Sequence, residues 1–240
     1  MRKLIVILIA VAASSFYAKK QQPALTGAWH LNYGTIEHVW TFIDGYSVKT
    51  AYDKVNRKFI YTWGGPYQMN GNDLLIRTEF NTANADSVGR TIRIIFTMNN
   101  NKLQLRPNRN AAVESEWLRL DNGTGALAGN WRIGARLEDG KLVESPAATG
   151  PRKTLKLLSG TRFQWFAINP EVKGFYGTGG GTYTFQNGKY TEHIEFFSRD
   201  STRVGASLTF DGKVENDAWS HSGLNSRGEP LNEVWRRVKQ

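Results

Sequence analysis

The chain has 240 residues, a formal net charge of +10 and no cysteine. The missing thiols exclude disulfides, zinc–thiolate sites, cysteine nucleophiles and a lipid-modified cysteine anchor. The positive charge is spread along the chain and forms no basic run, so the sequence does not indicate a nucleic-acid-binding protein. Without disulfides, the fold depends on an apolar core, to which 8 Trp, 9 Tyr and 12 Phe contribute.

Residues 1–18 have the pattern of a secretory signal peptide. Met1, Arg2 and Lys3 form a positive start, and the apolar run that ends near Ala13 is too short to span a bilayer. Cleavage is expected after Ala18 or nearer Ala13. We therefore predict a secreted or periplasmic protein, with no transmembrane segment in the mature chain.

Two stretches of the chain repeat each other in the same order. Leu25–Trp29 (LTGAW) returns as Leu127–Trp131 (LAGNW), and the Glu-Phe pair at 79–80 returns at 195–196. The offset changes only from 102 to 116 residues, as small insertions would cause. Copies of about a hundred residues are too long for a solenoid repeat and have the size of a small domain. The predicted domains are residues 24–120 and 127–240, joined by a linker at 121–126.

Each copy has the pattern of an all-β domain. Short runs rich in Thr, Tyr, Phe, Val and Ile are separated by Gly, Asn and Asp at intervals of roughly eight to twelve residues. Residues 182–185 and 189–195 flank Asn187 and Gly188, which favour a tight hairpin turn. About eight antiparallel strands per copy are expected to close into a barrel, because closure removes exposed edges. The predicted fold is two tandem antiparallel meander β-barrels.

The ends of each copy carry a shared pair of motifs. Gly-x-Trp on the first strand ends at Trp29 and Trp131, and Trp-x-Arg on the last strand ends at Arg119 and Arg237. These motifs resemble those of lipocalin-like (calycin) barrels, in particular the secreted, largely uncharacterised bacterial type. The resemblance implies that each Arg stacks on the Trp of its own barrel, a contact worth about 0.5–2 kcal/mol. It also implies a barrel that often holds an internal ligand, without indicating which ligand.

The second copy contains about 13 extra residues after its first strand, near residues 138–150. The resemblance implies that this loop lies at the open mouth of the barrel, where it can act as a lid. The alternative is a surface insertion without function, which loops tolerate at little cost.

Two histidines distinguish the second copy from the first. His193 and Glu195 are two residues apart, so they share one face of a strand, as do Trp219 and His221. If these faces meet inside the barrel, they could bind a polar ligand group, move a proton or hold a metal. In the alternative, both histidines face water and Glu195 is structural, like its counterpart Glu79.

Three further aromatic residues have polar edges that suit a cavity wall: Trp165, Tyr176 and Tyr183. The predicted ligand-binding set is therefore Trp165, Tyr176, Tyr183, His193, Glu195 and His221, with no metal site and no cofactor.

The expected function is the binding of a small apolar or amphiphilic ligand in the second barrel. One alternative is an extracellular glycan-binding or assembly module that acts through exposed Trp or Tyr. Another is a small isomerase or lyase that uses Glu195 with His193 or His221. No motif for a nucleophile and its base supports catalysis.

Overall fold

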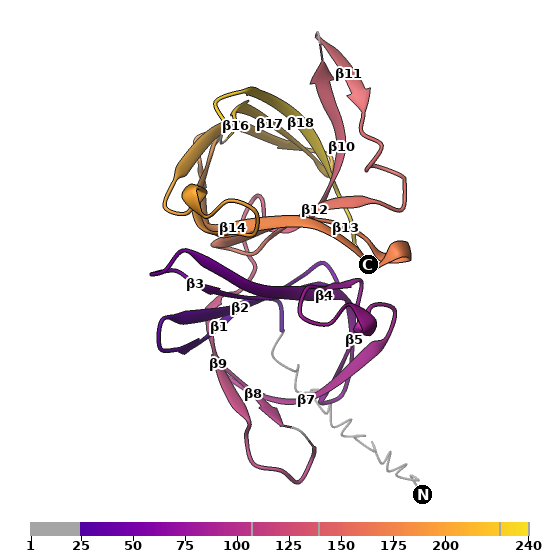
Figure 1. Cartoon of the computed structure of the whole chain (residues 1–240), viewed down its shortest axis with the longest axis vertical. Helices are drawn as coiled ribbons and strands as arrows, with labels where there is room; N and C mark the ends of the chain where they lie inside the picture. Colours follow the sequence, from indigo (N-terminus) through magenta and orange to yellow (C-terminus); the bar gives the residue numbers. More distant parts are fainter. Residues whose placement is uncertain (1–24, 107, 139, 226, 240) are drawn as a thin grey trace, which may run out of the picture.

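The computed structural model describes residues 25–106, 108–138, 140–225 and 227–239. The chain forms two closed, antiparallel eight-stranded β-barrels in tandem (Figure 1), which confirms the predicted fold class. The signal peptide predicted at 1–18 lies outside the described residues.

The first barrel closes through a pairing of β3 with β4, in the order β3-β2-β1-β9-β8-β7-β5-β4, and the short β6 also pairs with β4. Its strands are β1 Gly27–Tyr33, β2 Ile36–Ile43, β3 Tyr46–Asp53, β4 Lys58–Asn70, β5 Asp73–Arg77, β6 Phe80–Asn81, β7 Thr91–Asn99, β8 Lys102–Arg106 and β9 Ser115–Asp121.

The second barrel closes through a pairing of β10 with β18 and follows the chain from β12 to β18. Its strands are β10 Gly129–Glu138, β11 Lys141–Glu144, β12 Lys153–Leu158, β13 Arg162–Asn169, β14 Gly174–Gln186, β15 Lys189–Phe197, β16 Ser207–Glu215, β17 Ala218–Leu224 and β18 Pro230–Arg237. Three single 3₁₀ turns complete the described elements: Ala85–Ser87, Pro170–Val172 and Ser201–Arg203.

The predicted hairpin joins β14 to β15. Asn187 and Gly188 both have positive φ, at 51° and 73°. A two-residue turn with positive φ at both positions matches the right-handed twist of the strands that it joins. The sequence therefore predicted this hairpin and its turn correctly.

In both barrels the first strand pairs with the last, and the Trp and Arg of the end motifs are opposite each other. The Arg119 guanidinium lies 4.0 Å from the centre of the Trp29 ring, the contact that the resemblance implies. In the second barrel, the Arg237 guanidinium instead binds Asp44, in the β2–β3 turn of the first barrel, through contacts of 2.8 and 2.9 Å. This Arg therefore connects the two barrels.

The insertion at 138–150 continues the hairpin of β10 and β11. Leu137 pairs with Leu142, and all four residues of β11 are exposed. In Figure 1 this hairpin points away from the ring of strands. The hairpin does not form a closed lid in this structure.

The two barrels pack against each other through equivalent faces. The ring centres of Phe80 and Phe175 are 6.3 Å apart, and those of Phe196 and Phe59 are also 6.3 Å apart. Phe196 is the counterpart of Phe80 at the repeat offset of 116 residues, and Phe175 is the counterpart of Phe59. The Gln164 amide donates to a threonine hydroxyl of each barrel between these clusters. The interface thus resembles the two-fold interface of a homodimer, formed here within one chain.

Candidate functional site

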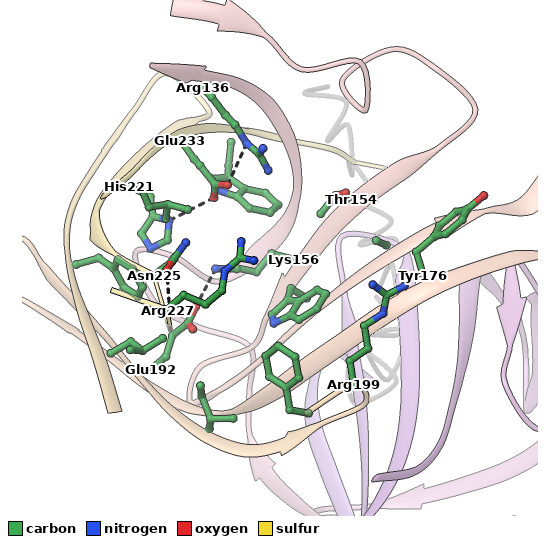
Figure 2. Close-up of a pocket in the computed structure, with 18 of the residues that line it drawn as sticks. Arg136, Thr154, Lys156, Tyr176, Glu192, Arg199, His221, Asn225, Arg227 and Glu233 are labelled. Atoms are coloured by element: carbon green, nitrogen blue, oxygen red, sulfur yellow. Dashed lines mark hydrogen bonds and ion pairs between the residues drawn. The ribbon is translucent and has the colours of Figure 1, made fainter. Parts of the chain in front are cut away.

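A cavity of about 600 Å³ lies inside the second barrel (Figure 2). Volumes of 300–1,000 Å³ are typical of small-molecule sites. Strands from all sides of the barrel contribute inward-facing side chains. The apolar part of the lining is Trp165, Ala167, Ile194, Phe197, Leu208, Phe210, Leu231 and Trp235. The charged part is Arg136, Arg152, Lys156, Glu192, Arg199, Arg227 and Glu233, with His221 beside them.

An ion pair between Lys156 and Glu192 lies in the buried part of the lining. The distance from Lys156 Nζ to Glu192 Oε1 is 2.8 Å, and each side chain is less than a tenth exposed. Nζ also lies 5.2–5.4 Å from the ring centres of Tyr190, Trp219 and Trp235. The carboxylate and the rings together stabilise a cation that burial alone would disfavour.

Next to this pair, His221 faces Glu233. His221 Nδ1 lies 3.7 Å from Glu233 Oε2, beyond hydrogen-bond distance, while Trp235 Nε1 donates to the same oxygen at 3.0 Å. Arg136 Nε lies 3.5 Å from the other carboxylate oxygen. Figure 2 shows His221 and Arg136 on the two sides of Glu233.

The protonation states of this pair follow from their surroundings. Burial, together with the charge of Lys156, lowers the pKa of His221. Burial raises the pKa of Glu233, but the neighbouring His221, Lys156 and Arg136 outweigh it and bring that pKa below its ordinary value. At neutral pH the pair is therefore a neutral imidazole beside a carboxylate.

Both ring nitrogens of His221 lack a hydrogen-bond partner within the described part of the chain. The side chain is only 2 % exposed. A neutral imidazole has one donor and one acceptor, and leaving both unpaired in a buried position is unfavourable. These nitrogens are thus unpaired polar atoms of a residue that lines the cavity.

The wall near the mouth is aromatic. Trp165 is half-buried and lies edge-on to Phe197, with 5.4 Å between ring centres. A Cβ added at Gly179, on the neighbouring strand β14, would lie 2.8 Å from Trp165 Nε1. The glycine at this position therefore makes room for the indole ring.

Five cations and two carboxylates line the cavity. Arg136, Lys156 and Arg227 are each paired with a glutamate. Arg152 and Arg199 are exposed and have no ion-pair partner among the described residues, and the Arg152 guanidinium lies 4.3 Å from the Tyr176 ring. The excess positive charge is therefore at the rim.

The predicted residues Trp165, Tyr176 and His221 line this cavity. Tyr183 does not: it is buried in the core, and its hydroxyl donates to the Ser159 carbonyl at 2.7 Å. His193 is exposed on the outer face, with Nδ1 at 2.7 Å from the Ser207 hydroxyl.

Glu195 is also outside the barrel, at the interface with the first barrel. It accepts hydrogen bonds from the Tyr52 hydroxyl and Lys54 Nζ, both at 2.7 Å, and forms an ion pair with Arg162. On β15 both Glu192 and Ile194 face inward, so His193 and Glu195 do share a face, but the outward one. The geometry therefore favours a structural role for Glu195.

Sequence reasoning did not identify Lys156, Glu192 or Glu233. A signal was present for Glu192, which alternates with Tyr190 and Ile194 on what reads as an apolar face of β15. A carboxylate in such a register indicates either a buried ion pair or a binding site.

No protein-family model matches this chain, and no curated protein matches it at a significant level. Within the described residues, no helix has the length and apolar character needed to cross a membrane. The same part of the chain contains no group of three or more His, Cys, Asp or Glu placed to hold a metal ion.

Proposed function

We propose that this chain is a binding protein whose second barrel holds a small amphiphilic ligand with a negatively charged group. The observation that carries the proposal is the cavity of about 600 Å³, which combines an apolar wall with two unpaired arginines at its rim. The apolar body of the ligand would lie against Trp165, Phe197 and Leu208. Its acidic group would bind Arg152 and Arg199, whose planar guanidinium groups suit carboxylate and phosphate oxygens.

The inner end of the cavity adds a second recognition element. His221 offers one donor and one acceptor that no described residue uses. A hydroxyl or carbonyl group on the ligand would satisfy one of them, and a purely hydrocarbon tail would not. The proposal therefore favours a ligand with a polar group at both ends over a simple fatty chain.

The rival functions have less support. None of the eight tryptophans is exposed, and Tyr33 is the single exposed large aromatic among the described residues, so no aromatic surface patch indicates glycan binding. For catalysis, Glu195 is bound to Arg162 at the interface and meets neither His193 nor His221.

The test compares dodecanoate with dodecanol by isothermal titration calorimetry. We expect dodecanoate to bind at least tenfold more tightly, because its carboxylate reaches the rim arginines. The double variant Arg152→Ala with Arg199→Ala should abolish that preference. The matched control, Arg77→Ala with Arg90→Ala, removes the same charge from exposed positions of the first barrel and should not change it.

A cavity-filling variant checks the location. Leu208→Trp narrows the apolar part of the cavity and should weaken binding of both probes. Equal affinities for acid and alcohol, or unchanged binding in Leu208→Trp, would contradict the proposal. Native mass spectrometry of protein purified from the exported fraction would identify a natural ligand, and its mature mass would test the predicted cleavage near Ala18.

A further inference from the structure

Each barrel contains an interior pair of a tryptophan and a lysine on two neighbouring strands. The strand that carries the tryptophan in one barrel carries the lysine in the other. Trp40 on β2 is paired with Lys49 on β3. At the equivalent register of the second barrel, Lys156 on β12 is paired with Trp165 on β13. Lys156 follows Trp40 by the repeat offset of 116 residues, and Trp165 follows Lys49 by the same offset. The two residue types have therefore exchanged positions between the barrels. Each barrel therefore has one lysine amine inside, but on different strands.

The two amines have different surroundings. Lys156 is neutralised by Glu192 at 2.8 Å. Lys49 Nζ lies 5.5 Å from the ring centre of Trp40 and 4.8 Å from that of Trp117. Within the described residues, Lys49 has no hydrogen-bond acceptor and no carboxylate at ion-pair distance. Burial lowers its pKa to about 8, against a weaker opposing effect of Glu114. An interior ammonium without a counter-ion is unfavourable, and an anion brought by a ligand would relieve that cost.

The rings around Lys49 form an aromatic cluster. Trp40 lies 5.6 Å from Trp117 and 5.8 Å from Trp63, measured between ring centres. His38 lies edge-on to Trp117 at 6.2 Å, and its Nδ1 is 3.2 Å from the Tyr61 hydroxyl. The exposed parts of these rings are flat π surfaces that suit an aromatic molecule.

One end of this cluster is partly exposed. His38, Tyr61 and Trp63 point inward and are only partly buried, whereas Trp40 and Trp117 beneath them are fully buried. Trp40 Nε1 is a buried donor without an acceptor within the described part of the chain. The donor that a ligand can reach is therefore Lys49 Nζ, which lies at the partly exposed end of the cluster.

We propose that the first barrel is a second binding site, in which Lys49 binds the carboxylate of a small aromatic acid whose ring packs against the partly exposed rings of this cluster. This site is separate from the cavity of the second barrel and does not depend on the function proposed there. It also differs in chemistry, because its interior lysine has no carboxylate partner among the described residues, whereas Lys156 of the second barrel is paired with Glu192.

The probes are 2-naphthoate and its uncharged analogue 2-naphthamide. To isolate the first barrel, binding is measured by calorimetry in the variant that carries Arg152→Ala, Arg199→Ala and Leu208→Trp. We expect naphthoate to bind with one site per chain and at least tenfold more tightly than the amide. Lys49→Met should remove the preference for the acid, and Lys49→Arg should restore much of it. The exposed Lys58→Met is the matched control and should have no effect.

The pH dependence gives a signature that a misfolded variant cannot imitate. The charged and titratable groups facing Lys49 are His38 on β2, Tyr61 on β4 and Glu114 before β9. Because the ammonium form binds the carboxylate, affinity for naphthoate should decrease as pH rises above about 8, approaching tenfold per unit. Affinity for the amide should stay constant over the same range.

Three results would overturn the inference: no binding of naphthoate to the wild-type chain at millimolar concentration, equal affinities for acid and amide, or undiminished acid binding in Lys49→Met. Each of these results leaves the second-barrel proposal untouched, because dodecanoate and the rim arginines test that site.

Discussion

Replacing Glu195 with glutamine removes the central negative charge of the interface between the barrels. Glu195 is 8 % exposed and contacts Arg162, Tyr52 and Lys54. Removing one partner of a buried ion pair costs about 3–5 kcal/mol, because the other charge stays buried. Arg162 keeps a second carboxylate, Glu37, at 2.9 Å, and glutamine can still accept from Tyr52. We therefore expect a loss of about 2–3 kcal/mol, below that range.

Thermal unfolding and urea denaturation at pH 7 measure this loss. For a chain of this length, the expected change is a decrease in Tm of about 6–10 °C. The matched control is Glu79→Gln, at the equivalent position of the first barrel, where the carboxylate contacts Tyr46 and Lys153. The side chains of Glu79 and Lys153 are 18 % and 25 % exposed, so this ion pair is more solvated and its loss should cost about 1 kcal/mol.

The pH dependence of the Glu195→Gln effect follows from the carboxylate's pKa. Burial alone would raise the pKa of Glu195, but Arg162, Lys54 and Tyr52 lower it below the ordinary value of 4.5. A carboxylate whose pKa is lowered by folding stabilises the protein at pH values above its ordinary pKa of 4.5. This stabilisation is lost as the pH falls through the lower pKa of the folded state. The gap between wild type and variant should therefore narrow at pH 3. A loss below 1 kcal/mol at pH 7, or a gap of the same size at pH 3, would refute the reasoning.

Two further predictions concern the tie between the barrels and the cavity. Arg237→Ala should destabilise the chain by about 2 kcal/mol in urea denaturation, since it removes charged hydrogen bonds to Asp44. Asp44→Asn should cost a similar amount and add little in the double variant; full additivity would argue against the tie. The pKa of His221 measured by NMR should be below 6.5. Because the unfolded chain then binds a proton more readily than the folded one, the free energy of unfolding should decrease as the pH falls below 6.5. A His221 pKa at or above 6.5 would contradict the buried, unpaired imidazole.

The duplication and the barrel architecture could be predicted from sequence because they depend on local patterns. The turn at Asn187 and Gly188 needs positive φ at both positions, which few residue types allow. The repeated end motifs place Trp29 opposite Arg119 across the seam that closes a barrel. Such features are visible in one dimension, since the residues that decide them are neighbours or recur at a constant offset.

The candidate site could be predicted only in part. Trp165, Tyr176 and His221 line the cavity, as expected. The rim arginines were not predicted, because they come from segments far apart in the sequence that meet only when the barrel closes. Lys156 and Glu192 were missed for the same reason, since 36 residues separate the two halves of their ion pair.

The sequence by itself determined that His193 and Glu195 share a face of their strand, because side chains alternate with a period of two. Only the tertiary structure decided that this face points outward. Along β15, the inward face lines its own barrel, and the outward face is partly covered by the first barrel, where Glu195 is 8 % exposed. When both faces of a strand are buried, apolar and polar residues occur on each, and alternation no longer indicates which one is the interior.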